Sequence, residues 1–98
     1  MKFPRADGTV RRSHAAVVYH PAKIPLERVR AAVEMQERAL GWAASRWYKT
    51  NAQDSGRAAA EQALAGDPAV IIVAGGDGTV RAVADVVHSS GIPIAPIP

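Results

Sequence analysis

The chain has 98 residues, which suits one small domain, and its 48% hydrophobic and 21% charged residues are typical of a globular protein. It contains no cysteine, which excludes disulfides, thiolate metal sites and a cysteine nucleophile, and which fits a cytoplasmic protein. No hydrophobic run approaches the roughly 18 residues that a membrane-spanning helix needs. The basic N-terminus has no hydrophobic segment behind it, so we expect no signal peptide.

The net charge is +3, and Lys2, Arg5, Arg11 and Arg12 gather near the N-terminus. We expect residues 1–13 to form a solvated basic tail. The alternative is that the tail makes a weak peripheral contact with an anionic membrane surface. Nucleic acid is not expected as a partner, because no aromatic residues interleave the charges and no recognition motif is present.

The first half of the chain reads as strand, helix, strand. The β-branched and aromatic run over 15–21 predicts a strand that proline closes. Hydrophobic residues at helical spacing predict a helix over 25–40, which starts at a proline and is followed by a glycine. Residues 45–50 predict a second strand, and the charges of Arg46 and Lys49 place it near a sheet edge.

The second half repeats this alternation. An alanine-rich helix is predicted over 57–66, and the wholly apolar strand 69–74 is of the kind that a parallel sheet buries on both faces. A third helix carries Val83 and Val87 on one face, and 92–98 reads as a fourth strand whose prolines limit its pairing. The order β-α-β-α-β-α-β predicts a three-layer α/β fold with an open, mostly parallel sheet. Its last strand would leave an open edge, so we weigh a homodimer against a monomer.

The stretch Gly-Gly-Asp-Gly-Thr, residues 75–79, falls between the third strand and the third helix. Ligands of open α/β sheets bind outside the carboxyl ends of the strands, and a helix N-terminus there favours phosphate. The three glycines can adopt positive φ and have no Cβ, so phosphate oxygens can approach the backbone closely, and Asp77 or Thr79 could cap the helix. The stretch is neither a Walker A loop nor G-x-G-x-x-G.

Asp77 is the informative residue of this stretch. Its carboxylate would repel phosphate unless it binds Mg²⁺, acts through a water, or caps the helix. The first of these suits phosphoryl transfer. The structural alternative is a tight strand-to-helix turn with an aspartate cap.

The segment VIIVAGGDGTVRAVADVV resembles the nucleotide-binding segment of the diacylglycerol kinase catalytic-domain family, which includes sphingosine kinases and bacterial lipid kinases. GGDGT also occurs in NAD kinases. Three further segments favour the lipid-kinase branch. AAVVYHPAK resembles its first strand and Asn-Pro turn, YKTNAQDSGRAAAEQAL its second strand and following helix, and SGIPIAPIP the stretch before its Leu-Gly-Thr-x-Asn loop. The resemblance covers residues 14–98.

The resemblance implies the fold of the N-terminal domain of diacylglycerol and NAD kinases, with ATP and Mg²⁺ as cofactors. Asp77 would be the catalytic residue and would hold Mg²⁺, directly or through a water. His20 stands where the family usually has Asn, and its imidazole still offers a donor and an acceptor. The implied nucleotide-binding residues are Gly75, Gly76, Asp77, Gly78, Thr79, Thr50, His20, Pro21 and Arg81.

The function that the resemblance implies is that of the ATP-binding part of a lipid kinase. The γ-phosphoryl group of ATP would pass to a hydroxyl of diacylglycerol or a related lipid. A C-terminal domain outside residues 14–98 would bind that lipid, so we expect the chain alone to be inactive. The alternatives are an NAD kinase-like enzyme and a non-catalytic nucleotide-binding or assembly module. We expect a cytoplasmic location, with a peripheral position at the membrane as the alternative.

Overall fold

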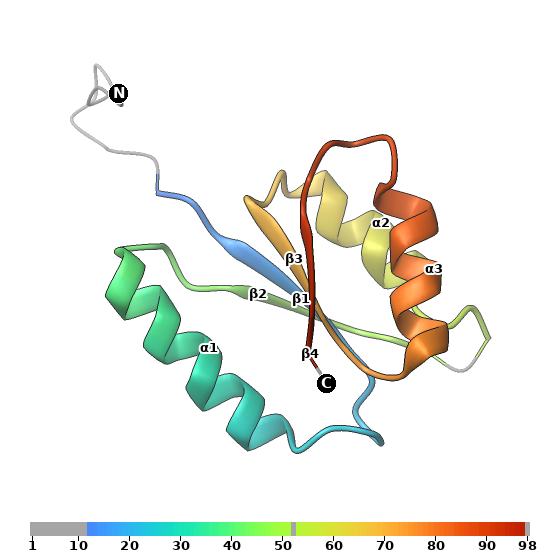
Figure 1. The fold of residues 1–98 in the computed structure, drawn as a ribbon, viewed down its shortest axis with the longest axis horizontal. Helices are drawn as coiled ribbons and strands as arrows, with labels where there is room; N and C mark the ends of the chain where they lie inside the picture. The colour runs from blue at the N-terminus through green and yellow to red at the C-terminus, as the bar shows by residue number, and fades with distance from the viewer. Residues whose placement is uncertain (1–11, 52, 98) are drawn as a thin grey trace.

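The computed structural model describes residues 12–51 and 53–97; most of the predicted basic tail lies outside these residues. Strands and helices alternate along the chain, as predicted (Figure 1). They are β1 (Ala15–Tyr19), α1 (Leu26–Leu40), β2 (Arg46–Lys49), α2 (Arg57–Ala65), β3 (Val70–Ala74), α3 (Asp77–Val87) and β4 (Ile94–Ile97). Among the described residues, no helix combines the length and hydrophobicity required to cross a bilayer.

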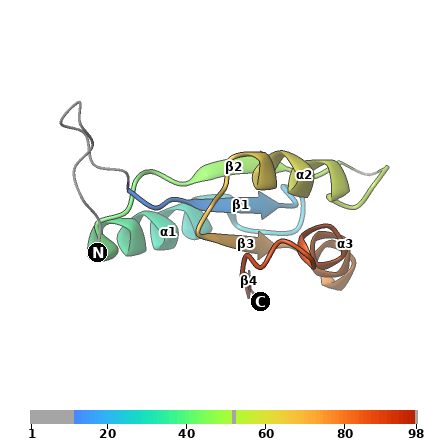
Figure 2. The same cartoon turned by 90° about the horizontal axis from the view of Figure 1, so that it is seen from above.

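The strands form one parallel sheet in the order β2-β1-β3-β4. In Figure 2 the arrows of β1 and β3 point toward the same end of the molecule. Helix α1 covers one face of the sheet, and α2 and α3 cover the other (Figure 1). This arrangement confirms the predicted three-layer α/β fold, and β2 lies at an edge, as its charges predict.

The core lies mainly between the sheet and the α2–α3 layer. Side chains of a strand alternate between the two faces, so Val18 and Val73 point toward this layer whereas Val17 points toward α1. Helix α2 contributes only alanines to the core, which lets its backbone approach the sheet closely; they are Ala59, Ala60 and Ala63. On the other face α1 packs through Val29 and Val33.

The element ends differ from the prediction by one or two residues, for local reasons. Helix α1 begins after Pro25 and ends at Gly41, whose φ of 69° is the left-handed conformation that stops helices. Strand β4 begins at Ile94 rather than at 92, although the carbonyl of Pro93 already accepts a hydrogen bond from the Ile71 N–H at 2.9 Å. This bond requires no N–H from proline, so Pro93 does not prevent β4 from pairing with β3.

Candidate functional site

The candidate site lies where the sheet order reverses direction. From β1 the chain crosses through α1 to β2 on one side, and from β3 it crosses through α3 to β4 on the other. The carboxyl ends of β1 and β3 are tied together because the His20 N–H donates to the Ala74 carbonyl at 2.9 Å. The Thr50 N–H donates likewise to the Tyr19 carbonyl at 2.9 Å. The loops after three strands therefore begin side by side, at the switch point where ligands bind in such sheets.

Helix α3 presents an open N-terminus at this point. Gly76 is its N-cap, and the N–H groups of Thr79 and Val80 donate to the Gly76 carbonyl at 3.0 and 3.1 Å. No side chain caps the helix, so the N–H groups before Thr79 and the positive end of the helix dipole are free to meet an anion. The predicted cap was wrong, because Asp77 is itself the first helical residue and Thr79 lies within the first turn.

The glycines act through their missing side chains. None of the three has a positive φ, so the left-handed conformation that glycine permits is not used in this turn. A Cβ on Gly75 would lie 3.0 to 3.2 Å from atoms of the Thr79 side chain, which is 5% exposed and packs directly on that glycine. A Cβ on Gly78 would meet nothing within 4 Å. Gly75 is thus needed for packing, whereas Gly78 leaves the start of α3 uncovered.

Lys23 ends the segment AAVVYHPAK, which resembles the family's Asn-Pro turn, but it is not among the predicted nucleotide-binding residues. The Lys23 N–H donates to the His20 carbonyl at 3.1 Å, which closes a turn over 20–23 with Pro21 in its second position. This turn brings the Lys23 ammonium against the glycine turn, 3.6 Å from the place that a Cβ on Gly76 would occupy. The sequence contains a signal for this position, because Lys23 comes a few residues after β1, and β1 pairs with β3, the strand that leads into the glycine turn.

His20 performs locally what an asparagine does in a similar turn. Its Nδ1 accepts a hydrogen bond from the Ala22 N–H at 3.3 Å, two residues along the chain. Asparagine side chains close turns with the same spacing. The imidazole therefore preserves the shape of the turn that carries Lys23.

Helix α2 also starts at this edge, but its N-terminus is closed. The Asp54 carboxylate accepts hydrogen bonds from the N–H groups of Gly56 and Ala58, both at 3.0 Å. These bonds, that of Gly56 foremost, lower the pKa of Asp54. A carboxylate therefore already occupies the start of α2, whereas the start of α3 is open.

Thr50 is buried beside the two helix starts. It is 6% exposed, and its Oγ1 has no hydrogen-bond partner among the described residues. Its methyl group lies 3.0 Å, and that of Thr79 3.6 Å, from the Cβ position of Gly56. A buried hydroxyl without a partner costs free energy, so a ligand that supplies one would be favoured here.

The donor set fits a polyphosphate that brings a divalent cation. The Asp77 side chain is exposed and forms no hydrogen bond or salt bridge with the described residues. Within the described part of the chain, no three His, Asp or Glu side chains gather to hold a metal. Mg²⁺ is commonly held by one or two carboxylates together with phosphate oxygens and waters, which is what Asp77 and a nucleotide would offer.

Most of the predicted site residues meet at this edge, but Arg81 does not. Gly75 to Thr79, Thr50, His20 and Pro21 all lie in the loops or first helical turn after the strands. Arg81 is exposed on α3, one helical turn beyond Asp77, and none of its atoms is among those nearest to a Cβ built on Gly75, Gly76 or Gly78. Beside the turn, an opening of about 280 Å³ is lined largely by apolar side chains, with Lys23 and Arg28 at its polar side.

Comparison with known proteins assigns the family. The sequence model of the diacylglycerol kinase catalytic domain matches residues 14–98, which include every element of the fold and every residue of the site. A search of curated proteins found no match. The family match and the observed fold agree with the resemblance seen in the sequence. The chain therefore belongs to the diacylglycerol kinase catalytic-domain family.

Proposed function

We propose that the chain is the ATP-binding part of a lipid kinase. Family membership indicates a kinase of the lipid or NAD type. The observation that carries the proposal further is the open N-terminus of α3, with no side-chain cap, beside the Lys23 ammonium. Free N–H groups, a helix dipole and one lysine form a site for the phosphates of a nucleotide.

Each residue has a distinct role in this proposal. The N–H groups at the start of α3 bind phosphate oxygens, and Lys23 neutralises part of their charge. Thr50 donates its free hydroxyl to the nucleotide. Asp77 holds Mg²⁺, directly or through a water, and a bound Mg²⁺ would neutralise charge on the transferred group. Catalysis then depends on positioning and electrostatic stabilisation more than on covalent chemistry.

The acceptor in this proposal is the hydroxyl of diacylglycerol or a related lipid. The sequence segments that resemble the lipid-kinase branch favour a lipid over NAD. In this proposal the residues of this chain bind the nucleotide, and none of them is assigned to the lipid.

The test is an assay of the complete polypeptide that carries this chain, with ATP and Mg²⁺ and either diacylglycerol or NAD as acceptor. We expect phosphate transfer to the lipid only, and loss of at least about a hundredfold in kcat in Asp77→Ala. Asp85→Ala is the matched control, because Asp85 is an exposed aspartate on the same helix, 4.0 Å from Arg57 in a surface ion pair. Transfer to NAD with diacylglycerol inert would overturn the lipid assignment, and equal kcat in both variants would overturn the role of Asp77.

A further inference from the structure

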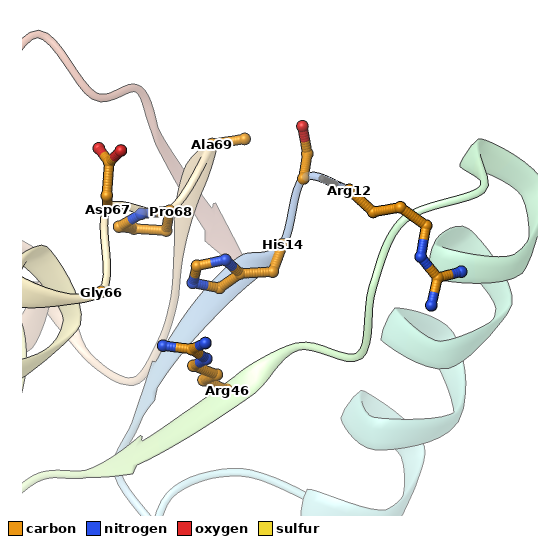
Figure 3. Close-up of a pocket in the computed structure, with 8 residues that line it drawn as sticks. Arg12, His14, Arg46, Gly66, Asp67, Pro68 and Ala69 are labelled. Carbon is orange, nitrogen blue, oxygen red and sulfur yellow. The ribbon is translucent and has the colours of Figure 1, made fainter. Parts of the chain in front are cut away.

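A second polar opening lies at the other end of the sheet from the glycine turn. It has a volume of about 370 Å³ and is bounded by the segment before β1, the start of β2 and the loop from α2 to β3 (Figure 3). A volume of this size is within the range of small-ligand sites. None of its lining residues belongs to the candidate nucleotide site.

Two side chains converge in this opening. Figure 3 shows the Arg46 guanidinium beside the His14 ring, next to Gly66. A Cβ on Gly66 would lie 3.0 Å from Arg46 Nη1 and 3.6 Å from His14 Nε2. Both nitrogens therefore approach the same point, and the absence of a side chain at Gly66 leaves the space for them.

Among residues 12–51 and 53–97, neither nitrogen has a hydrogen-bond or salt-bridge partner. His14 Nε2 is buried and has no hydrogen-bond partner among the described residues. In the same residues the one salt bridge joins Arg57 to Asp85, so Arg46 is in none. Asp67 is the single carboxylate among the lining residues, and Figure 3 shows its side chain directed away from Arg46.

The structural alternative is that the positive charge of Arg46 only stabilises the negative C-terminal end of the α2 dipole, which lies at Gly66. This alternative accounts for a cation at this position, but it leaves His14 Nε2 without a partner. An anion in the opening would contact the exposed Arg46 guanidinium and place a negative charge beside the His14 ring. Arg12, a second arginine that lines the opening, adds further positive charge at its rim.

We propose that this opening binds an anion of the phosphate class, held by the exposed Arg46 guanidinium beside the His14 ring, with Arg12 at the rim. The volume of about 370 Å³ also admits a phosphate ester. The ligand is therefore either a soluble phosphate compound or the headgroup of an anionic phospholipid, which offer the same chemistry.

Anion binding is coupled to the protonation of His14. Desolvation lowers the pKa of His14 from 6.5, the charge of Arg46 lowers it further, and Asp67 opposes this. Arg12 is the other charged group that lines the opening. A bound anion favours the imidazolium, so binding raises this pKa, and the affinity increases as the pH falls toward the lowered pKa that His14 has without the anion.

The test is a titration of the full chain with inorganic phosphate, followed by the NMR signals of the His14 ring. We expect a saturable shift of these signals, a raised His14 pKa, and an affinity at least about tenfold weaker in Arg46→Gln. Arg46→Lys should keep part of the affinity. Lys49→Gln is the matched control, because it removes a cation from the other end of β2. Phosphate that binds at the glycine turn is detected separately, through the amide signals of Gly76 and Gly78. The shift of these two signals on adding phosphate should be the same in every variant.

The proposal would be overturned if phosphate did not shift the His14 signals. It would also be overturned if phosphate shifted them equally in wild type and in a folded Arg46→Gln variant. Thermal unfolding of each variant shows whether it is folded. A second experiment identifies the source of the anion, with phosphatidylcholine vesicles that contain or lack phosphatidylglycerol. Arg46-dependent binding to the anionic vesicles supports a lipid headgroup. Phosphate binding at His14 without such vesicle binding supports a soluble phosphate compound.

Discussion

Lys23 and Thr50 are the two residues whose surroundings in the candidate site are known from the structure and not from the sequence. Lys23 brings a positive charge to the glycine turn, and Thr50 brings a buried hydroxyl without a partner. Among the described residues, the Thr50 hydroxyl has no hydrogen-bond partner and Lys23 is in no salt bridge. Both are therefore expected to affect nucleotide binding more than stability.

Lys23→Gln should weaken the binding of ATP about tenfold, because it removes one charge-assisted contact with phosphate. Isothermal titration of the chain with Mg²⁺ and ATP measures this loss. Arg38→Gln removes an equal charge from the last turn of α1 and should leave the affinity unchanged. Equal losses in the two variants would mean that Lys23 acts only through net charge.

Thr50→Val should separate binding from stability. Valine fills the same space without a buried hydroxyl, so unfolding in denaturant should show stability unchanged or raised by up to about 1 kcal/mol. Affinity for ATP should fall severalfold in the same variant. A clear loss of stability with unchanged affinity would show that the Thr50 hydroxyl serves the fold instead.

At the scale of elements, the starts of α2 and α3 differ in what covers them. Asp54 closes α2, whereas no side chain caps α3. The tight contact between Gly75 and Thr79 fixes where α3 begins. This difference between the two helix starts predicts that substitutions in the glycine turn change stability through packing, whereas the contribution of Asp54 to stability depends on pH.

Gly75→Ala and Gly78→Ala should have opposite effects on stability. A Cβ on Gly75 would lie 3.0 to 3.2 Å from the Thr79 side chain, and overpacking of this kind costs about 1–3 kcal/mol. A Cβ on Gly78 meets nothing within 4 Å, and alanine in a helix is favoured over glycine by up to about 1 kcal/mol. Chemical denaturation of both variants checks this order. Equal stabilities would contradict the packing of Thr79 on Gly75.

Asp54 should make the stability of α2 depend on pH. Its pKa in the folded chain is below the ordinary value of 3.8, so its contribution is present above pH 3.8 and is lost as the pH falls through the lower, folded value. Asp54→Ala should therefore be less stable than wild type at neutral pH, and the difference should shrink in acid. Thermal unfolding over a pH series measures it. A difference that stays constant down to strong acid would exclude the carboxylate cap.

At the scale of the whole molecule, the sequence predicted the fold because hydrophobic periodicity determines the order of strands and helices. That order brings the carboxyl ends of parallel strands to one edge, so the sequence pattern places the glycine turn there, and the family resemblance adds Thr50 and the turn over 20–23. The sequence does not show that the Lys23 ammonium lies beside Gly76, because this depends on how the turn over 20–23 folds. The cap of α3 was predicted wrongly, since Asp77 is the first helical residue.

The proximity of Arg46 to His14, at the other end of the sheet, is also a feature that the sequence pattern does not predict. It arises from the register of β1 on β2 and from the position of Gly66, neither of which the sequence pattern specifies. Charged residues near strand starts read as solvated surface when only the sequence is known. The structure shows that two of them face one opening.

The most direct test of the central claim is a titration of the 98-residue chain with ATP, with and without Mg²⁺, followed through its backbone amide signals. The account predicts saturable shifts in residues 75–79, in the turn over 20–23 and at Thr50, with tighter binding when Mg²⁺ is present and no such gain in Asp77→Ala. Shifts that lie elsewhere, or none at saturating ATP, would contradict the assignment of the α3 N-terminus as the nucleotide site.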